Sequence, residues 1–135
     1  MAFALYELDL NFFPTPWTLD SWKDLFNNQQ GFLILLKRDD SIIGFCLFDT
    51  VVADSFAHLL KILIIPSERI QGRAKMLLKE ALRNLDTNGF SRYFLEVEED
   101  NFSAIRLYLG LGFKTIHIKK HFYGENRSAL IMTKS

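Results

Sequence analysis

The sequence predicts a mixed α/β fold in which helices pack on a mixed β-sheet. Two observations favour this class. Short apolar runs typical of strands alternate with segments whose apolar residues recur at steps of three and four. The period changes beyond Pro66, and the resulting order from there on alternates strand and helix before ending in two strands. We therefore expect a central sheet with helices against it.

Length, composition and charge restrict the class of protein. We expect one domain over residues 1–135, because this length and a hydrophobic content of 49% support one continuous core. Sixteen basic residues balance sixteen acidic ones, which favours neither a nucleic acid nor a membrane surface as partner. The lone Cys46 excludes an internal disulfide, and the sequence shows neither a signal-peptide pattern nor an apolar run of the ~20 residues that span a membrane. We expect a cytoplasmic monomer or weak dimer.

The N-terminal third contains a proline-rich loop between two short elements. Periodicity does not distinguish strand from helix over residues 1–10, and we favour a strand there. The prolines of Phe13-Pro14-Thr15-Pro16-Trp17 predict an extended, irregular loop. Thr18 is a suitable N-cap for a helix over Asp20 to Phe26, ending near Asn27-Asn28.

A hairpin and a further strand follow. The strand-like runs Phe32 to Leu36 and Ile42 to Phe48 are joined by the charged turn Lys37-Arg38-Asp39-Asp40. Leu59 to Ile65 is a richly apolar strand that ends at Pro66. These segments predict three strands of the sheet.

The remaining elements begin with an amphipathic helix. Its apolar positions recur at helical spacing at Ala74, Leu77, Leu78, Ala81, Leu82 and Leu85. Asn88 and Gly89 predict a left-handed C-cap for this helix. The elements that follow are a strand over Tyr93 to Glu98, a helix over Phe102 to Leu109 closed by Gly110 and Gly112, and strands over Phe113 to Lys119 and Ser128 to Met132.

The turn before the amphipathic helix predicts an anion site. It contains Ile70-Gln71-Gly72-Arg73-Ala74-Lys75, and the free amides and positive dipole of a helix N-terminus attract phosphate. Arg69, Arg73 and Lys75 add positive charge, so a diphosphate is the natural ligand. From this motif alone, a tight turn at Gly72 without a ligand is an equally good interpretation. The turn lacks the pattern of a nucleotide P-loop or a dinucleotide fingerprint, which disfavours ATP and NAD.

Three polar residues further along are candidates for one pocket. Asn101 and Tyr108 are seven residues apart, which places them near the same face of a helix, and Glu96 lies on the strand before it. Each has a structural alternative. Glu96 could pair across the sheet, for example with Lys61, and Tyr108 could pack its ring at the edge of the core.

Together these segments resemble the GNAT acetyltransferase superfamily. The resemblance includes Arg-x-x-Gly-x-Ala at 69–74, Leu-Glu-Val at 95–97, Asn101, Ala-Ile-x-Leu-Tyr at 104–108 and Leu-Gly-Phe at 111–113. Within the superfamily the chain is most similar to the RimI-type ribosomal-protein-alanine N-acetyltransferases. Residues 13–22 resemble their Phe-Pro-Trp-Ser loop, and residues 119–123 resemble their Arg-x-x-Tyr-Tyr segment. The resemblance implies the GNAT fold, with helices on both faces of the sheet, and acetyl-CoA as co-substrate without a metal.

The resemblance also implies a role for each matching residue. Glu96 would accept a proton from the amine, and Tyr108 would donate one to the leaving thiol. The residues implied to contact acetyl-CoA are Ile62, Leu63 and Ile64 along the pantetheine arm, Ile70, Gln71, Gly72, Arg73, Ala74 and Lys75 around the diphosphate, and Asn101 further along.

The chain departs from the family at three places. Too few residues precede Phe13 for a usual first strand and helix, so we expect a shortened N-terminal region. Thr15-Pro16 is an insertion in the Phe-Pro-Trp loop. The hairpin Gly124 to Ser128 carries Arg127 where the family tends to have acidic residues. The acceptor is therefore either a protein N-terminus, such as that of a ribosomal protein, or a small amine, and a non-catalytic acyl-CoA-binding or interaction module is a third reading.

The chemistry of these residues fits direct transfer without a covalent intermediate. A protein α-amine has a reference pKa near ~7.7, so one modest base such as Glu96, acting directly or through water, suffices to deprotonate it. We expect Cys46 to be a small buried hydrophobe. His58, His117 and His121 lie on strands without a neighbouring carboxylate or cysteine cluster in the sequence, so no zinc site is predicted.

Overall fold

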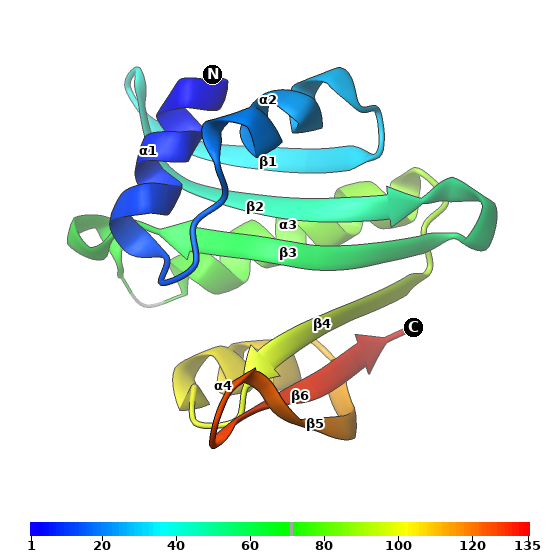
Figure 1. Ribbon diagram of the computed structural model, residues 1–135. Helices are drawn as coiled ribbons and strands as arrows, with labels where there is room; N and C mark the ends of the chain where they lie inside the picture. Colours follow the sequence, from blue (N-terminus) through cyan, green and yellow to red (C-terminus); the bar gives the residue numbers. More distant parts are fainter. Residues whose placement is uncertain (71) are drawn as a thin grey trace.

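The computed structural model describes residues 1–70 and 72–135, in which helices lie on both faces of a six-stranded sheet (Figure 1). The helices are α1 (Ala2–Phe12), α2 (Leu19–Asn27), α3 (Arg73–Thr87) and α4 (Phe102–Gly110). The strands are β1 (Gly31–Arg38), β2 (Ser41–Val51), β3 (Phe56–Ile64), β4 (Arg92–Glu98), β5 (Lys114–Gly124) and β6 (Arg127–Lys134). The predicted mixed α/β class is confirmed. None of the described helices is long and apolar enough to cross a membrane.

The sheet has the order β1-β2-β3-β4-β6-β5 and buries side chains on both faces. Successive residues of β2 point to opposite faces. Phe45 and Leu47 pack with Leu5 of α1 and Trp22 of α2, whereas Cys46 and Phe48 pack with residues of α3. Figure 1 shows α1 and α2 in front of the sheet and α3 behind it. The expectation of helices on both faces is therefore confirmed.

The strand favoured over residues 1–10 is wrong, because Ala2–Phe12 forms helix α1. Leu5 and Asp9, four residues apart, are the buried residues of this helix. Phe3, Leu10 and Phe12 are exposed, so apolar residues surround the helix and its sequence shows no apolar stripe. The region before β1 consists of α1, the proline-rich loop and α2, and no strand precedes β1 in the described part of the chain.

Asp9 joins α1 to three other segments through buried hydrogen bonds. Its carboxylate accepts from Nζ of Lys61 on β3 at 2.9 Å, from the backbone N–H of Trp17 at 2.8 Å and from Nε1 of Trp22 at 2.9 Å. The Lys61 ammonium also lies 4.4 Å from the centroid of the Phe13 ring. The proline-rich loop is thus fixed to the sheet by a fully satisfied polar network.

Most other elements match their predictions. Thr18 caps α2 by accepting a hydrogen bond from the Ser21 N–H at 3.1 Å, and β1 and β2 form the expected antiparallel hairpin. Leu77, Leu78, Ala81, Leu82 and Leu85 are the buried face of α3. The predicted C-cap of α3 is confirmed only in part, because Gly89 is left-handed (φ 94°) whereas Asn88 has φ −92°.

Strands β3 and β4 are paired over only a short length. They are parallel neighbours from Phe56 to His58 and from Arg92 to Phe94, and their registered pairing ends there. Figure 1 shows the two strands diverging beyond this point, toward the end of the sheet where α3 begins. Since β2 covers the other edge of β3, the edge of residues 59–64 that faces β4 is left without a strand partner. This divergence opens the sheet at its middle.

Candidate active site

A cavity of about 880 Å³ lies beside the diverging part of β3. It is bounded by the end of β3, the start of α3 and one face of α4. Its lining residues are Ile62, Leu63, Ile64, Arg69, Ile70, Gly72, Ala74, Lys75, Asn101, Ser103, Ala104, Arg106, Leu107, Tyr108 and Gly110. Most residues of the predicted anion turn and the predicted strand segment therefore meet in one cavity.

The start of α3 has the geometry of an anion site. Gly72 precedes the helix with φ 85° and ψ −5°, a left-handed conformation that glycine adopts without strain. A Cβ atom at this position would find no atom within 4 Å, so the backbone here is openly accessible. Lys75 and Arg69 line the same cavity and add positive charge. Gln71, which the resemblance also assigns to the diphosphate, lies outside the described residues.

The two arginines of the turn make hydrogen bonds within the protein. Arg69 donates from Nε to the Ile64 carbonyl at 2.7 Å and still lines the cavity. Arg73 donates from Nη1 to the carbonyl and the carboxylate of Glu68 at 2.8 and 3.0 Å. The cavity lining does not include Arg73. The guanidinium of Arg73 is thus bound to Glu68, whose Oε1 also accepts from Arg38, and its assignment to the diphosphate stays a prediction.

Ile62, Leu63 and Ile64 line the cavity along the part of β3 that has diverged from β4. An unpaired strand edge binds an extended chain that carries amide groups, as in the addition of a further strand. The carbonyl of Ile64 is already occupied by Arg69. The remaining edge is therefore suited to a ligand with amide bonds.

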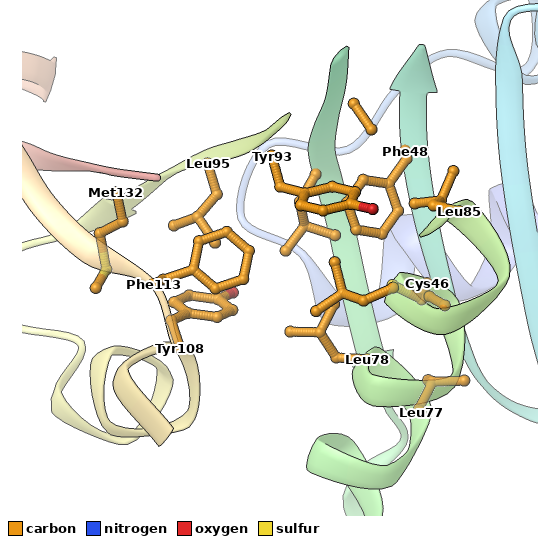
Figure 2. Packing of buried hydrophobic residues seen from close by; sticks show 14 of the residues in the cluster. Cys46, Phe48, Leu77, Leu78, Leu85, Tyr93, Leu95, Tyr108, Phe113 and Met132 are labelled. Carbon is orange, nitrogen blue, oxygen red and sulfur yellow. The ribbon is translucent and has the colours of Figure 1, made fainter. Parts of the chain in front are cut away.

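Asn101 and Tyr108 line the same cavity from α4, as their spacing predicts. Asn101 is the N-cap of this helix, and its side chain accepts from the Ala104 N–H at 3.3 Å. Tyr108 is only 6% exposed, and its ring lies 6.0 Å from that of Phe113 (Figure 2). Burial, followed by the proximity of Cys46 and Tyr123, raises the pKa of Tyr108 above its usual value. The phenol is therefore a proton donor that stays protonated at neutral pH.

Glu96 lies on the opposite face of β4 from the core residues Leu95 and Val97, and it is not among the residues that line the cavity. The expectation that one pocket holds Glu96 together with Asn101 and Tyr108 is therefore wrong for this cavity. The Oε2 atom of Glu96 lies 2.6 Å from Nε2 of His58 on β3. The alternative partner Lys61 is wrong, because Lys61 binds Asp9. The contact between His58 and Glu96 joins a single carboxylate to the histidine and was not predicted from the sequence. Sequence reasoning missed this pair because 38 positions separate its members.

The hairpin of β5 and β6 supplies further groups near Glu96. Burial, and then the charges of Glu96 and Glu98, raise the pKa of Tyr123 to about 12. Arg127 donates from Nε and Nη2 to the two oxygens of Glu98 at 3.1 and 2.8 Å, and these hydrogen bonds lower the pKa of Glu98. Arg127, which departs from the family pattern, thus neutralises Glu98, an acidic residue on the same face of β4 as Glu96.

Sequence reasoning also missed the middle of α4. Ser103, Ala104 and Leu107 line the cavity between Asn101 and Tyr108. The signal was available for Ala104, which lies three residues after Asn101 and four before Tyr108 and so shares their helix face. Among the described residues no group of three or more His, Cys, Asp or Glu side chains is placed to hold a metal ion.

Comparisons with known proteins agree with this geometry. Residues 2–113 match the acetyltransferase (GNAT) family. The chain is 33% identical over 134 residues to the [ribosomal protein bS18]-alanine N-acetyltransferase of Haemophilus ducreyi, covering 95% of this chain and 89% of that protein.

Two solved structures share the fold. One is the ribosomal-protein-S18-alanine N-acetyltransferase of Escherichia coli, with a TM-score of 0.89 and 24% identity over 98% of this chain and 86% of that one. The other is NAA60 of Arabidopsis thaliana in complex with acetyl-CoA, with a TM-score of 0.81 and 18% identity over 98% and 91% of the two chains. The family match, the relative and the shared fold together show that the chain belongs to the acetyltransferase (GNAT) family.

Proposed function

We propose that this N-acetyltransferase moves the acetyl group of acetyl-CoA to the N-terminal α-amine of a ribosomal protein that begins with alanine. The observation that carries the proposal is the cavity that runs from the start of α3, along the open edge of β3, to Tyr108. The name of the Haemophilus ducreyi relative, which aligns over 95% of this chain, supports the acceptor. We assign the activity to the cytoplasm, where ribosomal proteins are made.

The cavity fits coenzyme A in its charge and shape. The open backbone at Gly72, the first turn of α3 and the cation of Lys75 would hold the diphosphate. The free edge of β3 at Ile62 and Leu63 would hydrogen-bond the amides of the pantetheine arm. Asn101 would contact the arm from the start of α4. When bound, acetyl-CoA supplies an activated acyl group as a thioester.

Two side chains would then move the protons. Glu96, directly or through a water molecule, would accept the proton that the attacking amine loses. Tyr108, whose buried phenol keeps its proton, would donate to the sulfur as the carbon–sulfur bond breaks. The new amide bond replaces the thioester, so one proton leaves the amine and one reaches the thiol. No covalent bond to the enzyme is required.

The acceptor follows from the cost of deprotonation. A protein α-amine has a reference pKa near ~7.7, and a lysine side chain has one near ~10.4. At neutral pH an appreciable fraction of the α-amine is already neutral, whereas a lysine would need a much stronger base. The cost of deprotonation that a single carboxylate such as Glu96 must meet is therefore smaller for an α-amine than for a lysine.

An acetyl-CoA consumption assay with peptides tests this acceptor. We expect turnover with a peptide that begins with alanine and none with the same peptide blocked at its N-terminus. A blocked peptide that carries an internal lysine serves as the second control. Preference for the lysine peptide would contradict the α-amine assignment. Turnover confined to small amines would instead place the acceptor among small molecules, as the altered hairpin with Arg127 permits.

A further inference from the structure

We propose that His58 is a positioning residue that holds one oxygen of Glu96 and leaves the other oxygen to receive the proton of the amine. This inference rests on the proposed function, because it takes Glu96 as the base. His58 lies on β3 and Glu96 on β4, and their contact of 2.6 Å joins Nε2 to Oε2. The two side chains are 24% and 18% exposed, so water screens the contact only in part.

The imidazole of His58 is itself fixed by stacking. Its ring lies 4.0 Å from the ring of Phe94 at an interplanar angle of 13°. Phe94 is the register partner of His58 and belongs to the last registered pair between the two strands. Glu96 is two residues further along, at the point where β4 leaves β3. The stacked histidine therefore holds the Glu96 carboxylate at the place where β4 no longer pairs with β3.

The other charged groups near this pair do not compete with Glu96 for the imidazole of His58. On β2, Asp49 is the register partner of His58 and is exposed. On β3, Lys61 is held by Asp9 on the same face of the sheet. Tyr123, on the hairpin, lies close enough to Glu96 that, besides burial, the carboxylate charge raises the pKa of its phenol. Arg127, which also belongs to the hairpin, is bound to Glu98.

A donor at this position has a definite chemical effect. With Glu96 ionised, the tautomer of His58 that carries its proton on Nε2 donates to Oε2. The contact fixes the orientation of the carboxylate and with it the direction of its free oxygen. Loss of the donor should therefore loosen the geometry of Glu96.

The test compares variants that separate stacking from hydrogen bonding. His58→Phe keeps a ring against Phe94 and removes the donor, whereas His58→Gln keeps an N–H donor. We expect His58→Phe to lower kcat about tenfold, the effect of losing one charge-assisted hydrogen bond, and to leave the KM for acetyl-CoA unchanged, because His58 does not line the cavity. His58→Gln should recover part of the lost kcat and also leave this KM unchanged. The control His117→Phe, on the exposed strand β5, should change neither.

A second set of variants keeps this inference distinct from the proposed function. In Glu96→Gln enzyme, adding His58→Phe should cause no further loss, because the residue that His58 positions is already changed. Full activity of Glu96→Gln would end the role of Glu96 as base, and with it both claims. If Glu96→Gln is impaired while His58→Phe keeps the wild-type kcat, only the role of His58 is overturned. A further independent loss in the double variant would also contradict positioning through Glu96.

Discussion

Replacing Asp9 by alanine is expected to destabilise the fold by about 3–5 kcal/mol, the cost of breaking a buried ion pair by removing one partner. Asp9 is fully buried and Lys61 is 7% exposed, so the substitution leaves an ammonium group without its counter-ion. It also leaves the indole N–H of Trp22 and the backbone N–H of Trp17 without their acceptor. The midpoint of thermal unfolding should fall by on the order of 10 °C.

Two further variants make this prediction specific to the pair. Glu7→Ala lies on the same helix at an exposed position and should change stability by less than about 0.5 kcal/mol. Adding Lys61→Met to Asp9→Ala removes the unpaired charge and should recover part of the loss. Denaturant unfolding measures all three. If Asp9→Ala is no more destabilised than Glu7→Ala, the buried network does not stabilise the loop as we describe.

Replacing Tyr108 by phenylalanine is expected to lower kcat by about a hundredfold or more, the usual contribution of a general acid, while the affinity for acetyl-CoA stays nearly unchanged. The substitution removes only the hydroxyl, so the ring still packs on Phe113 and still closes the cavity. Steady-state kinetics together with a direct binding measurement separates the two effects. Tyr93→Phe is the matched control.

The control is informative because Tyr93 is also a buried tyrosine, but its hydroxyl donates to Asp86 and to the Phe90 carbonyl. Its loss should reduce stability and leave turnover unchanged. An equal loss of turnover in both variants would show a general effect on the fold. A wild-type kcat for Tyr108→Phe would remove the proposed acid.

The pH dependence follows from the raised pKa of Tyr108. A tyrosine has a reference pKa of about 10, and burial moves this value upward, so the proton is retained to higher pH in the folded protein. The kcat of the wild-type enzyme should therefore not fall up to about pH 10 through loss of this proton. A falling limb well below that pH that disappears in Tyr108→Phe would contradict the raised pKa of Tyr108, although not its role as the acid.

The elements with a clear period could be predicted from the sequence, and the site could be predicted in part. The buried face of α3 and the cap at Thr18 depend on neighbours in sequence, and both are confirmed. Asn101 and Tyr108 reach one cavity because helix geometry alone relates residues seven positions apart.

What the sequence could not show are the contacts between distant strands. The hydrophobic pattern does not reveal helix α1, because its inward residue Asp9 is polar. Its partner, Lys61, lies 52 positions away in the sequence. The divergence of β3 from β4 is a property of the sheet, so the pair of His58 and Glu96 beside it has no local signal. The hydrogen bonds that Arg73 donates to Glu68 were likewise not predicted.

The central claim is that the start of α3 binds the diphosphate of coenzyme A, and isothermal titration calorimetry with acetyl-CoA tests it most directly. We expect one site with a dissociation constant in the range of ~1 μM to 1 mM typical of enzyme substrates. Lys75→Ala, in the cavity, should weaken binding, and this effect should shrink at high salt, whereas Lys79→Ala, one turn further along α3 and exposed, should bind as the wild type does. No detectable binding, or equal weakening by both substitutions, would contradict the account.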